Sequence, residues 1–106
     1  MNGNRGERIQ EAVRATAAEF LAKEAGPQSL ITVTQVALSN DARSARVFIS
    51  VLPESAEEAA LAFAQRNRRE LAEFFRTRVR GAFPPHFEFM IDRGEKNRQR
   101  LDELSS

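Results

Sequence analysis

Two short segments in which every second residue is apolar follow each other in the sequence, separated by a polar turn at 39–42. In the second segment, 45–51, the apolar residues occupy alternate positions, which is the spacing of a half-buried β-strand. In the first, the alternation changes parity between Val33 and Val36, which predicts a β-bulge at 34–35. A β-hairpin in the first half of the chain therefore restricts the possible folds more than any other feature.

Segments with a helical spacing of apolar residues flank this hairpin. A first helix is expected at about 7–23, ended by Gly26 and Pro27. A second helix is expected to begin at Ser55, where Glu58 completes a capping box.

A polar stretch at 65–69 interrupts the second helix. A third helix follows, with the apolar residues of 71–79 on one face, and Gly81 and the prolines at 84–85 end it. The alternating apolar residues of 87–91 predict a third strand.

The predicted order of elements is α-β-β-α-α-β, in a single KH-like domain over 1–106 with a polar lead-in at 1–6 and a polar C-terminal tail at 93–106. The long helical connection between the second and third strands favours a parallel, right-handed crossover. We therefore predict an α+β fold of the type II KH class, with a three-stranded sheet covered by helices on one face. Domains of this class bind RNA.

The composition excludes several classes of protein. The chain has no cysteine, so disulfides, thiolate catalysis and cysteine zinc sites are ruled out. His86, the only histidine, is expected to be a loop residue, and no catalytic motif or metal-binding spacing occurs. No apolar run is long enough to cross a membrane, and the N-terminus does not resemble a signal peptide. We expect a cytoplasmic protein and rank an enzyme last.

Basic residues are concentrated in one part of a nearly neutral chain. The net charge is +1, but six arginines lie between Arg66 and Arg80, where only Glu70 and Glu73 oppose them. A local cluster of this kind is the electrostatic pattern of a surface that contacts phosphate groups.

One face of the third helix is expected to carry Arg69, Glu73, Arg76 and Arg80. This ridge has two interpretations: a solvated face with ion pairs such as Arg69–Glu73, or a row of groups that contact phosphates. Arg78 falls toward the apolar face, where it is expected to pack at the edge of the core.

Four further side chains belong to the hairpin and the last strand. Arg43 and Arg46 flank the turn and either extend the basic cluster or are ordinary surface charges. Phe48 and Met90 are expected on the sheet face opposite the helices. There, an aromatic ring could stack on a base, but cross-strand packing is the favoured interpretation.

Several segments resemble the ribosome-binding factor A family, in the right order over roughly residues 5–95. The resemblance covers both hairpin strands, the opening helix, the arginine-rich helix that runs into Pro85, and the last strand. The residues that carry it are Arg8-Ile9, Ile31-Thr32-Val33-Thr34-Gln35-Val36, Leu38-Ser39-Asn40-Asp41, Ala45-Arg46-Val47-Phe48-Ile49-Ser50-Val51-Leu52 and Phe87-Glu88-Phe89-Met90-Ile91-Asp92.

The resemblance implies a KH-like fold and a protein that binds the small (30S) ribosomal subunit and its 16S rRNA. It implies a role in subunit assembly and rRNA maturation, an association with cold adaptation, no cofactor and no enzymatic activity. The family's Ala-x-Gly kink between the two central helices is replaced here by Asn67-Arg68-Arg69. We expect either that Asn67 forms the kink or that the helices run on more continuously.

Charge clustering and resemblance together predict a set of RNA contacts on a monomeric protein. The alternative is a KH-like protein-interaction or dimerisation module that adds a strand at the sheet edge and has incidental RNA affinity. The predicted RNA-binding residues are Arg66, Arg68, Arg69, Arg76, Arg80, Arg43 and Arg46.

Overall fold

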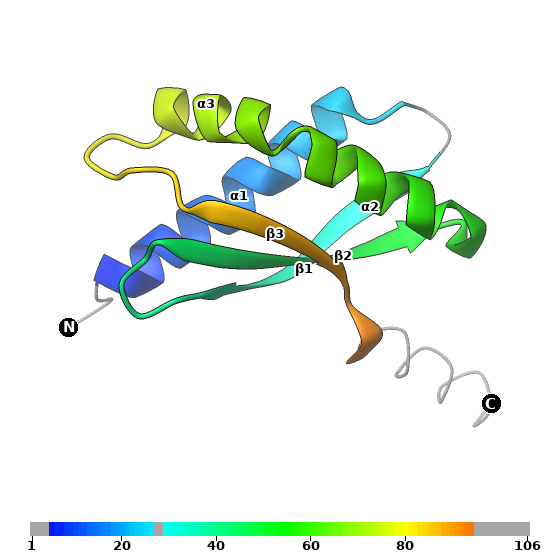
Figure 1. Ribbon diagram of the computed structural model, residues 1–106, viewed down its shortest axis with the longest axis horizontal. Coiled ribbons are helices and arrows are strands. Elements are labelled where there is room, and N and C mark those ends of the chain that lie inside the picture. Colours follow the sequence, from blue (N-terminus) through cyan, green and yellow to red (C-terminus); the bar gives the residue numbers. More distant parts are fainter. Residues whose placement is uncertain (1–4, 27–28, 95–106) are drawn as a thin grey trace.

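A three-stranded sheet in the order β1-β2-β3 forms the centre of the computed structural model, which describes residues 5–26 and 29–94 (Figure 1). The strands are β1 (Leu30–Leu38), β2 (Ser44–Leu52) and β3 (His86–Ile91). β1 and β2 pair antiparallel, whereas β2 and β3 pair parallel. The parallel pairing confirms the crossover that the long helical connection predicts.

A bulge in β1 sets which side chains face the helices. Val33 pairs with Ile49 and Gln35 with Phe48, so Thr34 has no partner in the register. Its hydroxyl instead donates a hydrogen bond to the carboxylate of Asp92, and its oxygen also lies 3.3 Å from the carbonyl oxygen of Phe48. Because of this extra residue, the apolar side chains before and after it point to the same face of the sheet, and the predicted bulge is confirmed.

Three α-helices and one short 3-10 helix surround the strands: α1 (Arg5–Glu24), η1 (Glu54–Ala56), α2 (Glu57–Arg66) and α3 (Arg68–Arg78). The predicted capping box is wrong, because Ser55 lies within η1 and α2 begins at Glu57, with no side-chain cap at Ala56. The glutamates of the first turn of α2 still lie where the positive end of the helix dipole favours them.

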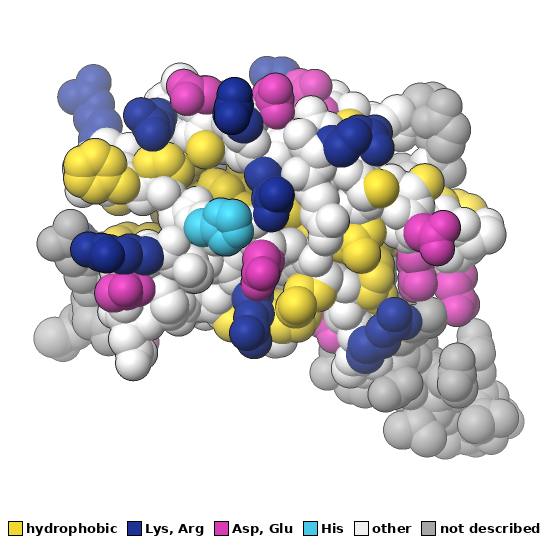
Figure 2. Space-filling view, in the orientation of Figure 1, with side chains coloured by type: hydrophobic (Ala, Val, Ile, Leu, Met, Phe, Trp, Pro, Cys, Tyr) yellow, Lys and Arg dark blue, Asp and Glu magenta, His cyan; other side chains and the backbone are white. Residues whose placement is uncertain are grey.

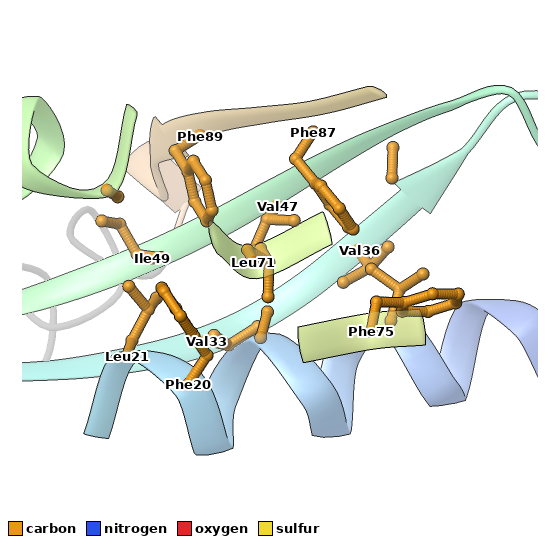
Figure 3. Packing of buried hydrophobic residues seen from close by; sticks show 14 of the residues in the cluster. Phe20, Leu21, Val33, Val36, Val47, Ile49, Leu71, Phe75, Phe87 and Phe89 are labelled. Atoms are coloured by element: carbon orange, nitrogen blue, oxygen red, sulfur yellow. The ribbon is translucent and has the colours of Figure 1, made fainter. Parts of the chain in front are cut away.

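All the described α-helices pack on one face of the sheet, α1 on β1 and α2 on β3. α3 packs against α1, and its Phe75 meets the β3 residue Phe87 with ring centroids 6.2 Å apart (Figure 3). The fold is α+β with helices on one face, as predicted. The largest fully buried side chains are Phe75, Leu21, Ile49, Leu71, Val13 and Val47.

The opposite face of the sheet has no described helix over it. Phe48 and Met90 are half-buried there, and the register places them side by side on β2 and β3. Gln35 of β1 completes the row. This arrangement favours the cross-strand packing interpretation of both apolar residues.

Candidate nucleic-acid interface

A single residue, Asn67, separates α2 from α3. Its backbone N–H lies 3.2 Å from the carbonyl oxygens of both Phe63 and Ala64, and its side-chain amide donates to the carbonyl oxygen of Phe63 at 2.8 Å. Two donors thus satisfy carbonyls at the end of α2. Of the two expected alternatives, the structure has the helices interrupted at Asn67, but the φ of this residue, −100°, is an ordinary negative value. The side-chain amide, and not tolerance of an unusual backbone angle, accounts for asparagine here.

Arg66, Arg68 and Arg69 lie around this change of direction and line an open hollow of about 650 Å³. The opposite side of the hollow belongs to the segment that enters β3, which includes Pro85 and His86. We call this surface the junction hollow. The residues that line it are Gln65, Arg66, Arg68, Arg69, Glu70, Ala72, Pro85, His86 and Phe87.

The three guanidinium groups of the junction hollow are exposed, and none forms an ion pair within the described ranges 5–26 and 29–94. The possible Arg69–Glu73 pair is not formed. Because an arginine carries five N–H donors in a planar fork, these groups can hold phosphate oxygens two at a time.

The predicted ridge on α3 is only partly correct. Arg69, Glu73 and Arg76 are exposed on the helix, and Arg76 stands two turns, about 10 Å, from Arg69. Arg80 is not on the helix, because α3 ends at Arg78 and Val79 is extended. Arg80 instead lines a second hollow, next to Arg8 of α1.

The two hairpin arginines each have an acidic neighbour. The Nε of Arg46 lies 3.8 Å from a carboxylate oxygen of Glu88, its partner across the parallel strands. The Nε of Arg43 lies 4.0 Å from a carboxylate oxygen of Asp41. Exposed ion pairs of this kind are weak, so both guanidinium groups can still bind another anion. Arg46 borders a hollow that shares His86 with the junction hollow, whereas Arg43 lies at the hairpin turn.

Arg78 has a structural position, as its place on the helix predicts. Its guanidinium carbon lies 4.5 Å from the centroid of the Phe74 ring, and its Nη2 donates to a carboxylate oxygen of Glu19 at 2.9 Å. The side chain therefore connects α3 to α1.

Sequence reasoning missed three side chains at these surfaces. His86 is the first residue of β3 and not a loop residue, and it lines the junction hollow. Phe83 is 89% exposed in the loop before it, and Arg8 projects from α1 beside Arg80. The available signal was the position of Phe83, an aromatic residue between Gly81 and two prolines, outside every periodic segment.

A network of hydrogen bonds holds the hairpin turn. The hydroxyl of Ser39 and the backbone N–H of Arg43 both donate to Oδ1 of Asp41, at 2.8 and 3.1 Å. These bonds, the one from Ser39 first, lower the pKa of the Asp41 carboxyl. Asp41 thus stays negative and fixed beside Arg43.

The basic side chains visible in Figure 2 are distributed over the face, with acidic side chains between several of them. The predicted RNA-binding residues are divided in the structure: Arg66, Arg68 and Arg69 line the junction hollow, Arg43 and Arg80 line two other hollows, and Arg46 and Arg76 lie outside all three. Within the described part of the chain, no three His, Cys, Asp or Glu side chains are grouped to hold a metal ion. No helix in that part is long and apolar enough to cross a membrane.

Comparison with known proteins gives one consistent match. Residues 5–105 match the family model of ribosome-binding factor A. The chain is 31% identical over 102 residues to ribosome-binding factor A of Thermodesulfovibrio yellowstonii, with 94% of this chain and 86% of that protein covered.

Solved structures agree with the sequence comparison. The crystal structure of ribosome-binding factor A from Thermus thermophilus superimposes with a TM-score of 0.71 at 29% identity, covering 79% of this chain and 91% of that one. A homology model of the Thermus thermophilus factor, fitted into the cryo-EM map of its 30S complex, also gives 0.71. It is 30% identical and covers 81% and 93% of the two chains.

Proposed function

This chain belongs to the ribosome-binding factor A family, and from that membership we propose that it docks on the small ribosomal subunit and acts in the assembly of that subunit. The Thermus thermophilus relative fitted into a 30S complex supports this choice of partner. We further propose that the chain contacts 16S rRNA as a monomer and serves the maturation of that rRNA, without cofactor or catalysis.

The observation that carries the proposed rRNA contact is the junction hollow. Arg66, Arg68 and Arg69 present three guanidinium groups to one open surface, and no described side chain forms an ion pair with them. The phenyl ring that lines the hollow, Phe87, is only 2% exposed and cannot stack on a base. The hollow therefore offers guanidinium groups without a stacking ring, which favours contacts to phosphates; such contacts fix the position of the protein on RNA without reading the base sequence.

Sedimentation with purified ribosomal subunits tests the proposed function. We expect the protein to pellet with small subunits and not with large ones, and to pellet less as salt concentration rises, because binding releases counterions from the RNA. Equal pelleting with both subunits would contradict the proposal.

A triple variant, R66Q/R68Q/R69Q, tests the junction hollow itself. Losing three phosphate contacts should lower the slope of log affinity against log salt by about two to three. A fourfold rise in salt should then weaken the variant about 20- to 40-fold less than it weakens the wild type. The matched control, R14Q/K23Q/R93Q, removes the same charge elsewhere. If both triple variants behave alike, only net charge matters and the hollow has no specific part.

A second candidate function rests on β1, which is an edge strand. Leu30 and its cross-strand neighbour Leu52 are 63% and 56% exposed at one end of that edge, where a strand of another protein or a second copy could add. Light scattering discriminates between the candidates. A stable dimer that Leu30→Lys dissociates would favour the interaction module over the monomeric rRNA-binding factor.

A further inference from the structure

Phe83 has the highest exposed fraction among the large apolar side chains that the structure describes, at 89%. It lies in the loop between α3 and β3. An isolated exposed apolar residue is common on protein surfaces and needs no function to explain it.

The loop is fixed at both of its ends. Gly81, with a φ of +77°, reverses the chain directly after α3, a conformation that favours glycine. At the other end, the backbone N–H of His86 donates to the carbonyl oxygen of Arg43 at 2.8 Å, which joins the start of β3 to the hairpin turn. Phe83 is thus presented beside the hairpin turn.

Phe83 lines one of two adjoining hollows, which share Ile9 and Ala82 in their walls. One is lined by Phe83 with Arg43 of the hairpin turn, and the other by Arg8 and Arg80. We call this combined surface the Phe83 end. At the corresponding end of the molecule, Figure 2 shows hydrophobic side chains with basic side chains above and below them.

Three arginines from three separate segments thus line two adjoining hollows, one of which also carries the exposed ring. Asp41 is the one acidic residue among the described side chains that line these two hollows, and its carboxylate already accepts hydrogen bonds from Ser39 and Arg43. The surface therefore combines an unobstructed aromatic face with a net positive charge.

We propose that the Phe83 end binds an unpaired RNA nucleotide, with its base stacked on the Phe83 ring and the neighbouring phosphates held by Arg8, Arg43 and Arg80. This proposal deepens the proposed function and rests on it. Unpaired bases stack on aromatic side chains next to basic groups in many RNA-binding proteins. Within the described part of the chain, the three arginines of this surface have a single acidic residue among them, which favours a polyanion such as RNA as the partner.

The chain has no tryptophan and no tyrosine, so Phe83→Trp places a single indole at the proposed site. Single-stranded oligouridylate should quench the fluorescence of this variant in a saturable way, because a stacked base is in direct contact with the indole. The duplex of oligouridylate with oligoadenylate should quench it much less. Phe48→Trp, on the open face of the sheet, is the matched control and should not respond.

Truncation measures the contribution of the ring. Phe83→Ala should weaken binding of oligouridylate roughly five- to hundredfold. Phe83→Leu keeps an apolar side chain without a stacking face, and should be nearly as weak. Three results would each overturn the proposal. The first is wild-type affinity for oligouridylate in Phe83→Leu, and the second is an unquenched indole in Phe83→Trp at saturating RNA. The third is quenching in Phe48→Trp alone.

The two proposals fail in different ways. If the wild type pellets with small subunits but oligouridylate leaves the F83W indole unquenched, the Phe83 end is overturned and the subunit proposal stands. If oligouridylate quenches the indole but the wild type pellets with neither subunit, the Phe83 end keeps its RNA contact and the choice of the ribosomal partner is overturned. A protein partner would instead bind Phe83→Leu as it binds the wild type.

Discussion

The junction hollow and the Phe83 end carry three arginines each, in different surroundings. At the junction hollow, the arginines lie beside the start of β3, and the phenyl ring of Phe87 there is buried. At the Phe83 end, the ring is exposed and the arginines come from separate segments. Under the two proposals, equal numbers of charges serve two kinds of contact, one to phosphates alone and one to a base with its phosphates.

The largest expected effect comes from a substitution in the hydrophobic core beneath both regions. Phe75 is fully buried on α3 and meets Phe87 of β3 at 63° between the ring planes. Phe75→Ala should lower the free energy of unfolding by about 3–5 kcal/mol, measured by urea unfolding followed by circular dichroism. The half-buried Phe74 is the control, and its replacement by alanine should cost less. Equal losses would contradict this assignment of the core.

Asn67→Ala should affect the junction hollow and leave the Phe83 end unchanged. Losing the side-chain bond to the carbonyl of Phe63 should cost about 1 kcal/mol in the free energy of unfolding. Small-subunit affinity should fall as Arg68 and Arg69 move, whereas quenching of the F83W indole should not change. The control Gln10→Ala, at an exposed position of α1, should change neither the stability nor the subunit affinity. Loss of quenching in Asn67→Ala would show that the two regions are coupled.

A pair of opposite substitutions tests the backbone of the Phe83 end. Gly81 (φ +77°) and Ala42 (φ +61°) both lie in the left-handed region. Gly81→Ala should cost about 1 kcal/mol, although the space for a Cβ is open, because the penalty lies in the backbone. Ala42→Gly should stabilise the protein by about 0.5 kcal/mol. Thermal unfolding of both variants measures the two changes in stability. Changes in the same direction would contradict the assignment of strain to these two φ angles.

The smallest effect concerns the titration of Asp41. Its pKa is lowered in the folded protein, so the associated stability is present above the pKa of the unfolded chain and is lost as pH falls through the folded pKa. Ser39→Ala removes the main cause, and the pKa of Asp41 should rise toward its ordinary value. Carboxyl-carbon NMR titration of the two proteins measures the change. An unchanged pKa would assign the shift to the Arg43 amide instead.

The periodicity of apolar residues was sufficient to predict the strands and the bulge in β1, and the long helical connection between β2 and β3 predicted the parallel crossover. It failed at the end of α3, because Val79 continues the apolar pattern of the helix while its backbone is already extended. For the same reason, the predicted ridge contained Arg80. Periodicity reports which side chains are buried and says little about where a helix ends.

The candidate sites could be predicted only in part. The grouping of Arg66, Arg68 and Arg69 follows from their proximity in sequence. The pairing of Arg46 with Glu88 does not, since it depends on the register of strands that are far apart in the chain. The surroundings of Phe83 also combine three distant segments, and no local pattern indicates them.

The parallel crossover has a consequence for the order in which this protein becomes functional during its synthesis. The arginines of the junction hollow leave the exit tunnel before Pro85, His86 and Phe87, which supply the opposite wall. β3 can pair only with a β2 strand that was translated much earlier. The junction hollow is therefore complete only after β3 has been translated and has paired with β2.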